Sequence, residues 1–302
     1  MPENEHYFFG VTKLRNEIYV LCRSPSPALN EIRVFEDRTP FRLQKEIEIK
    51  EILLPWDIVS NEKKKCLYVS DFGQKCVSKI TRETNDQHKI IKWLTTDYKP
   101  RTLSVSSDGQ LLMVNDSSHC LMIYGPDAEF IQSILFPSHI IYPRHAVETS
   151  IGNFVIIHNE EQEEKVMEEV KHKVRLERKK RKVGSYGRRK DVILVVSELD
   201  RDGQMVNRRF IPSNEPRQLN FNGYYLSLDS DDRVFMTDRE SGRVILLASD
   251  LKWNRILCPT KEENEATRIR EPFRLCYDKE MKQLIVGGYD RTDVNVYTLI
   301  RY

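Results

Sequence analysis

A unit of about 45 residues recurs along this chain of 302 residues. Four copies begin with a proline and an alternating apolar run, followed by a polar turn and two further strand-like segments. The first three such prolines are 45 and 43 residues apart. Because one unit of this kind cannot bury its apolar face alone, the units must pack on one another, so the repeat constrains the whole fold. The four clearest openings are PWDIV (55–59), PRTLSV (100–105), PRHAV (143–147) and PFRLCY (272–277).

Short strands with alternating apolar residues fill these units. Segments of this kind, separated by turns rich in Gly, Asn, Asp and Ser, indicate antiparallel meanders. Repeats of about 45 residues with three or four strands are typical of propeller blades. Six units fill the chain, which predicts one all-β domain over residues 1–302, a six-bladed β-propeller. A β-sandwich also has many short strands, but the recurrence of a whole unit favours the propeller.

The last unit is shorter than the others. It offers PFRLCY, QLIVGG (283–288) and DVNVYTL (293–299), which make three strands, whereas the first unit has its own fourth strand in FRLQKEIEI (41–49). A fourth strand for the last blade must therefore come from residues 1–7 or be missing. We expect a weak or three-stranded sixth blade.

Two segments resemble a known repeat. CLYVSDFGQKCVSKI (66–80) and RVFMTDRESGRVILL (233–247) are similar to the strand–Asp–turn–strand core of NHL repeats, and the likeness extends over nearly the whole chain. Units one, four and six depart from the pattern; unit four has His158 where the Asp would stand, and unit six has GGYD (287–290). The chain thus resembles the propeller domain of TRIM-NHL proteins. This resemblance implies the fold rather than one function, because propellers carry many activities.

One rim of the predicted propeller is the candidate binding surface. The first strand of each blade begins there and the second strand ends there, so residues at these points surround one mouth of the central channel. Exposed aromatic and Arg side chains are the usual components of binding hot spots. The residues predicted to form a protein-binding rim are Trp56, Arg101, Arg144, His145, Arg217, Phe273, Arg274 and Tyr289.

Aspartates at the strand ends have two interpretations. A carboxylate there accepts hydrogen bonds from the N–H groups of the following turn, or pairs with a rim arginine, and either role is structural. Alternatively, carboxylates and histidines converge in the channel around a metal, as in the six-bladed lactonases and lyases. The residues concerned are Asp71, Asp116, His158, Asp238 and Asp290.

Catalysis is the third hypothesis, behind two binding functions. A lactonase of the gluconolactonase kind would need an early glutamate facing the channel, and FFGVTKL (8–14) has none. A lyase would need several histidines in the channel, and only His145 and His158 have sequence positions that predict this location. The G-x-S-x-G, P-loop and H-E-x-x-H motifs are also missing from the sequence. We therefore expect no enzyme activity, no cofactor and no metal.

A charged insertion separates two strands of the fourth unit. FVIIHN (154–159) and VILVVSEL (192–199) are predicted neighbours, and residues 160–191 lie between them. The insertion has glutamates first and Lys or Arg later, with good helix formers throughout, which predicts a helix unless the arm is simply solvated and disordered. Its basic half, 171–190, is a candidate nucleic-acid or anion site or a nuclear-import signal. The residues are Arg178, Lys179, Lys180, Arg181, Lys182, Tyr186, Arg188, Arg189 and Lys190.

Charge and cysteine content limit the classes of partner and compartment that we expect for this chain. Residues 160–190 carry twelve Lys or Arg and seven Glu, which leaves a charge of −3 on the rest of the chain and argues against general nucleic-acid binding by the propeller body. The six cysteines are scattered, and no apolar stretch is long enough for a membrane helix. We expect a monomeric cytoplasmic or nuclear scaffold that binds a protein partner; an RNA-binding propeller with phosphates on the basic arm is the alternative.

Overall fold

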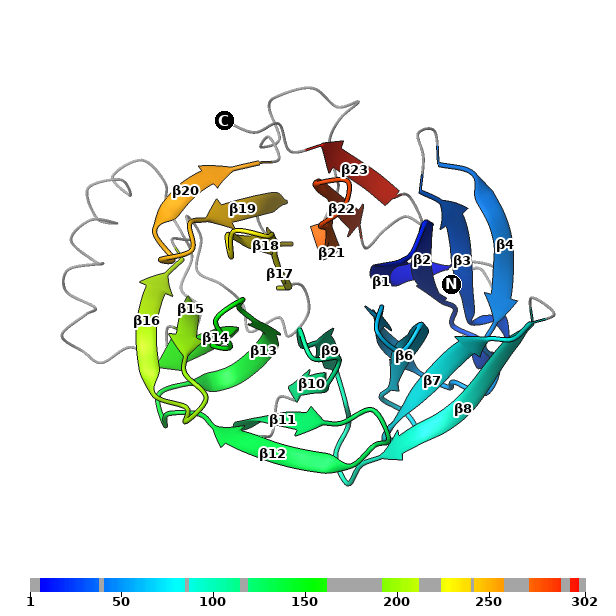
Figure 1. Ribbon diagram of the computed structural model, residues 1–302, viewed down its shortest axis with the longest axis horizontal. Coiled ribbons are helices and arrows are strands. Elements are labelled where there is room, and N and C mark those ends of the chain that lie inside the picture. Colours follow the sequence, from blue (N-terminus) through cyan, green and yellow to red (C-terminus); the bar gives the residue numbers. More distant parts are fainter. Residues whose placement is uncertain are drawn as a thin grey trace, which may run out of the picture.

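In the computed structural model, the described residues are 6–37, 41–84, 87–114, 119–161, 192–211, 224–239, 242–257, 272–288 and 294–298. They form an all-β propeller whose sheets stand around a central axis (Figure 1). In this part of the chain the one helix is a single 3-10 turn, Pro27–Leu29. No helix within the described ranges has the length and apolar character needed to cross a membrane.

Each sheet is a meander of strands that follow one another in the sequence. The first sheet contains β1 (Tyr7–Leu14), β2 (Glu17–Arg23), β3 (Glu31–Glu36) and β4 (Leu43–Glu48). The second contains β5 (Pro55–Asn61), β6 (Cys66–Asp71), β7 (Cys76–Arg82) and β8 (His88–Thr95). The third contains β9 (Thr102–Val105), β10 (Leu111–Val114), β11 (Cys120–Tyr124) and β12 (Phe130–Leu135).

The remaining sheets repeat this order with longer excursions between the strands. The fourth contains β13 (Ile141–Glu148), β14 (Phe154–Glu161), β15 (Val192–Leu199) and β16 (Met205–Phe210). The fifth contains β17 (Leu226–Leu228), β18 (Val234–Asp238), β19 (Arg243–Leu247) and β20 (Trp253–Ile256). The last contains β21 (Pro272–Asp278), β22 (Gln283–Gly288) and β23 (Val294–Thr298).

The predicted all-β propeller is confirmed, but the number of complete blades is smaller than expected. Five sheets have four strands, and the last sheet has three strands among the described residues, so six complete blades are not present there. Tyr7 already belongs to β1, and β4 is the first sheet's own outer strand. The N-terminal segment from Tyr7 onward is therefore committed to the first sheet and cannot complete the last one.

The predicted insertion begins later than expected. Glu160 and Glu161 belong to β14, where they pair with Ile193 and Val192 of β15. Their charge is typical of a loop, yet the antiparallel pairing of β14 with β15 continues through both residues. The insertion therefore starts at residue 162 and not at residue 160. Residues 162–191, with the predicted helix and its basic cluster, lie outside the described residues. The flanking strands pair directly, so this segment joins two neighbouring strands of one sheet.

The middle strands are buried on both faces because each sheet packs between two neighbouring sheets. All six residues of β6 are buried, including the polar Ser70 and Asp71. In contrast, five of the six residues of the outer strand β12 are exposed. This difference explains why the second strand of a unit is a nearly continuous apolar run, whereas the outer strands alternate or are polar.

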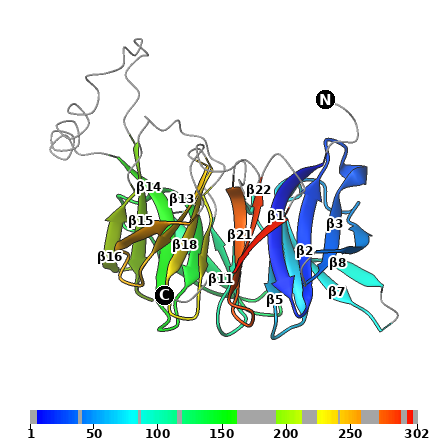
Figure 2. The ribbon, with the colours of Figure 1, turned by 90° about the horizontal axis from the view of Figure 1, so that it is seen from above.

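The first and last sheets close the ring by side-chain packing (Figure 2). β1 contacts β5 on one side and β21 and β22 on the other. A Cβ added to Gly10 of β1 would lie 2.6 Å from Cγ2 of Ile58, and one added to Gly287 of β22 would lie 1.8 Å from the Phe8 ring. Both glycines thus permit close approach of the sheets. The Lys13 ammonium of β1 then contacts Asp278 across the junction.

Candidate functional site at the channel mouth

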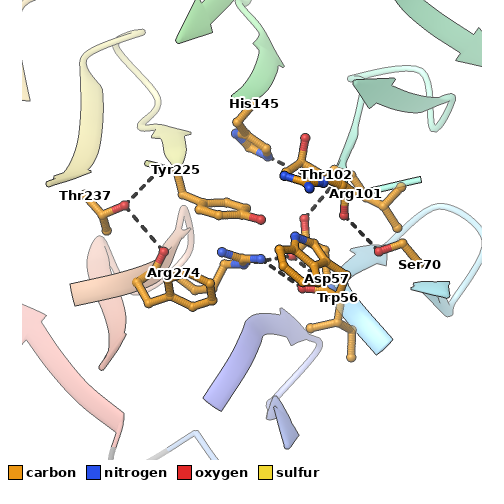
Figure 3. Close-up of polar contacts among 12 residues, drawn as sticks. Trp56, Asp57, Ser70, Arg101, Thr102, His145, Tyr225, Thr237 and Arg274 are labelled. Atoms are coloured by element: carbon orange, nitrogen blue, oxygen red, sulfur yellow. Dashed lines mark hydrogen bonds and ion pairs between the residues drawn. The ribbon is translucent and has the colours of Figure 1, made fainter. Parts of the chain in front are cut away.

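Residues of the innermost strands meet in the central channel (Figure 3). β5 brings Trp56 and Asp57, β13 brings His145, and β21 brings Arg274, while Tyr225 stands just before β17. In each unit the opening proline or polar residue ends the preceding loop, and the alternating run that follows points every second side chain toward the channel. Residues distant in sequence therefore meet at this point.

A buried ion pair crosses the channel. The Arg274 Nε donates to Oδ1 of Asp57 at 3.2 Å, and both side chains are almost fully buried. The Asp57 carboxylate also accepts hydrogen bonds from the backbone N–H groups of Ile58 at 3.0 Å and Leu103 at 2.9 Å. Burial raises the pKa of Asp57 to about 6, although the positive charge of Arg274 acts in the opposite direction. Asp57 is thus held in place by three donors.

The guanidinium of Arg274 is stacked as well as paired. Its central carbon lies 3.2 Å from the centroid of the Tyr225 ring and 4.0 Å from that of Phe273. Nη2 donates to the backbone oxygen of Trp56 at 2.9 Å. Burial lowers the pKa of Arg274, but an arginine keeps its charge in proteins. The remaining nitrogen, Nη1, is buried and has no hydrogen-bond partner among the described residues.

His145 is a neutral link between neighbouring sheets. Its Nε2 lies 3.1 Å from the backbone oxygen of Leu103, to which it donates, and Nδ1 accepts from the backbone N–H of Leu226 at 3.2 Å. Both ring nitrogens are therefore used within one tautomer. Burial lowers the pKa of His145 to about 4. With Asp57 bonded to Leu103, the histidine extends a polar chain from β5 through β9 and β13 to β17.

This arrangement predicts that the protein loses stability in mild acid. Burial also lowers the pKa of His158 to about 4, and an unfolded histidine titrates near 6.5. A base with a depressed folded pKa stabilises the fold fully above pH 6.5 and loses that stabilisation as the pH falls toward 4. The raised pKa of Asp57 acts oppositely, favouring the fold below about pH 6. We expect a net loss of about 2 kcal/mol between pH 7 and pH 5.

Urea denaturation at the two pH values measures this loss. The double variant His145→Gln/His158→Gln, whatever its stability at pH 7, should no longer lose stability when the pH is lowered from 7 to 5. An equally steep loss in the double variant would show that other groups cause it.

Around the buried pair lies a layer of stacked rings and cations at the channel opening. Trp56 packs against Phe9 and Phe72, with ring centroids 5.5 and 5.4 Å apart. The Arg101 guanidinium lies 5.2 Å from the Trp56 ring and 5.3 Å from the Phe72 ring. Trp56, Phe72 and Arg101 are partly exposed. We call this set the cation–aromatic mouth; its members are Phe9, Arg23, Trp56, Phe72, Lys99, Arg101 and Arg239.

The predicted rim residues are divided between the opening and the interior. Trp56 and Arg101 are partly exposed and lie in the mouth. Four others are buried, with exposed fractions of 6% or less, which corrects the expectation that they form an exposed surface. They are turned inward because the innermost strands converge on the channel axis. These four are Arg144, His145, Phe273 and Arg274; Arg217, Tyr289 and the basic residues of 162–191 lie outside the described residues.

The strand-end aspartates that the structure describes have structural roles. Asp71 accepts hydrogen bonds from the backbone N–H groups of Leu53, Leu54 and Gly73 at 2.8, 3.1 and 2.9 Å. Asp238 forms an ion pair with Arg243, 2.8 Å from its Nη2. Asp116 and Asp290 lie outside the described residues.

Metal ligands are not assembled in the described part of the chain. His158 is fully buried, and its Nε2 lies 2.8 Å from the Ser197 hydroxyl. No group of three His, Cys, Asp or Glu side chains suited to a metal ion is found within the described ranges.

Several site residues were not predicted from the sequence. Asp57 stands inside an apolar run, PWDIV, where a charged residue at an inward position is the signal that could have found it. Phe9, Phe72 and Tyr225 carry no such signal, because an aromatic residue beside a strand is most often part of the core.

Solved structures of similar fold cover nearly the whole chain. Hydrazine synthase from Kuenenia stuttgartiensis is 16% identical with a TM-score of 0.58, over 97% of this chain and 83% of that one. Inactive virginiamycin B lyase from Staphylococcus aureus with quinupristin is 10% identical with a TM-score of 0.58, over 99% and 97%. A gluconolactonase from Xanthomonas campestris is 11% identical with a TM-score of 0.54, over 95% and 85%.

These identities show a shared β-propeller fold and nothing finer. No protein-family model and no curated protein matches the sequence. The resemblance to NHL repeats therefore stays a prediction.

Proposed function

We propose that this chain is a non-enzymatic binding propeller whose cation–aromatic mouth recognises a segment of a protein partner. The observation that carries the proposal is the stacking of Trp56 and Phe72 under the Arg101 guanidinium at the channel opening, where all three are partly exposed. Trp and Arg are the residues most enriched at interface hot spots, and rigid rings lose little conformational entropy on binding.

The interior of the channel supports binding rather than catalysis. A general base needs a lone pair that faces the substrate, and both nitrogens of His145 are engaged by backbone groups. The Asp57 carboxylate is likewise occupied by two backbone donors and by Arg274. These groups act as the polar framework that holds the innermost strands together, while the partly exposed rings above them are available for contact.

The test compares two matched double variants. Proteins retained by the tagged wild-type chain are identified by mass spectrometry, and the most enriched one is purified for calorimetric titration. Trp56→Ala/Arg101→Gln should weaken its binding at least tenfold, which corresponds to about 1.4 kcal/mol. Phe130→Ala/Lys252→Gln removes one exposed aromatic residue and one exposed cation from the outside of the propeller and should leave the affinity unchanged. Equal affinities for all three proteins would refute the proposal.

RNA binding by the basic arm is a distinct outcome of the same experiment. If the retained material is RNA, its affinity should fall steeply with salt, by a slope of about 0.7 per neutralised phosphate. Changing Arg178, Lys179, Lys180, Arg181 and Lys182 to Gln would then flatten that slope, and the RNA alternative would replace the protein partner.

A further inference from the structure

The channel beneath the mouth contains a hydrogen-bond donor that no described residue accepts. Arg274 is 2% exposed, and Nη1 of its guanidinium is buried with no hydrogen-bond partner. The other two nitrogens are fixed by Asp57 and by the Trp56 backbone oxygen, so the group cannot turn to satisfy Nη1 without breaking those bonds. A buried unpaired donor on a charged group is costly, and native structures rarely keep one without a reason.

The position of Arg274 connects this donor with the mouth. Nη2 donates to the backbone oxygen of Trp56, so the guanidinium is bonded directly to a residue of the mouth. The Tyr225 and Phe273 rings pack against it, and the Phe273 ring packs against Phe9 of the mouth at 5.9 Å. With two rings packed against the guanidinium and two nitrogens bonded, Nη1 is the nitrogen left for contact with a further group.

The charges around the opening favour an acceptor with one negative charge. Arg23, Lys99 and Arg101 lie over rings of the mouth, and Arg239 lies over Phe273 beside Arg274. The nearest described carboxylate, Asp57, already neutralises part of the Arg274 charge. A dianion such as a phosphate monoester would add two charges beside Asp57, whereas a carboxylate adds one and matches the planar edge of a guanidinium.

We infer that the partner segment inserts an acidic side chain, Glu or Asp, through the cation–aromatic mouth so that its carboxylate accepts hydrogen bonds from Nη1 of Arg274. This inference rests on the proposed function and adds the chemistry of the recognised residue. Trp56 and Phe72 contact the segment around the acidic residue, and the cations of the mouth attract it. Specificity then arises from the buried donor, because an apolar or basic residue would leave Nη1 unpaired and a neutral amide would accept only a weaker hydrogen bond than a carboxylate.

The first test uses fluorescein-labelled hexaglutamate as the probe and labelled hexaglutamine as its uncharged control, with binding followed by fluorescence anisotropy at low salt. We expect hexaglutamate to bind and hexaglutamine not to bind. Arg274→Lys keeps a positive charge for Asp57 but removes the planar fork, and it should weaken hexaglutamate binding at least tenfold. Arg233→Lys makes the same change at the ion pair with Asp229, in the turn between β17 and β18, and should leave the affinity unchanged. Thermal melting verifies that both variants are folded.

The outcomes separate this inference from the proposed function. Equal hexaglutamate binding by wild type and Arg274→Lys would overturn the inference. Binding of acetate in calorimetry together with no binding of hexaglutamate would also overturn it, since that result indicates a site for a free small acid. In the purified partner, changing each Glu and Asp of the bound segment to Gln or Asn should reveal one position with a tenfold loss. If no position shows it while Trp56→Ala/Arg101→Gln still weakens binding, the proposed function stands and the inference fails.

Discussion

Replacing Arg274 by methionine is expected to lower the free energy of unfolding by about 3–5 kcal/mol. Methionine fills much of the same space between Tyr225 and Phe273, so packing is largely kept, but the Asp57 carboxylate loses its only side-chain cation in the described channel. A buried carboxylate without a counter-charge must either remain charged at high cost or take up a proton. Urea denaturation at pH 7.5 measures the loss.

The double variant Asp57→Asn/Arg274→Met provides the control. Asparagine is almost isosteric and can still accept a hydrogen bond from Leu103, so it should recover more than half of the stability lost in the single variant. The stability difference between wild type and Arg274→Met should also shrink as the pH is lowered from 7.5 to 5.5, because protonation removes the unpaired charge of Asp57 while the histidines affect both proteins alike. A single variant as stable as the wild type would show that the pair contributes nothing to the fold.

The meander and its strands were predictable because they depend on local patterns. The prolines at 55, 143 and 272 fall at or inside β5, β13 and β21, and Pro100 precedes β9 by two residues. The second strand of each unit was recognisable because burial on both faces requires a continuous apolar run, as in CLYVSD. The end of β14 was not predictable, since Glu160 and Glu161 have the composition of a loop and are held in the ladder by pairing with β15.

The site was only partly predictable because it depends on closure of the ring. The positions of Trp56 and Arg101 follow from the rule that first strands begin at one rim. Whether such a residue is exposed or faces inward depends on how far the innermost strands converge, which no local pattern encodes. Asp57 and Arg274 are 217 residues apart, and their pairing exists only because β5 and β21 stand on either side of β1. The sequence pattern therefore predicts Arg274 on the surface, whereas in the structure Arg274 is the buried counter-charge of Asp57.

Closure itself leads to the second large expected effect, at Lys13. Its ammonium lies 2.6 Å from Oδ2 of Asp37, which directly follows β3 of the first sheet, and also contacts Asp278 at the end of β21. All three side chains are at most 7% exposed. Lys13→Met leaves two buried carboxylates without their shared cation, so we expect a loss of about 3–5 kcal/mol in the free energy of unfolding.

Hydrogen exchange shows whether that loss lies at the junction between the first and last sheets. In the described residues the junction depends on Lys13 and on side-chain packing, which includes Gly287 against Phe8 and the apolar cluster that β1 shares with Phe273 and Ile285, because no strand is shared between the two sheets. Lys13→Met should therefore increase the exchange of amides in β1, β21 and β22 before those of β10 or β14. Lys252→Met, which removes the lysine of an exposed pair with Asp250, should leave stability and exchange unchanged. Uniformly faster exchange in Lys13→Met would mean that the ring opens as one unit and that the junction is not its weakest point.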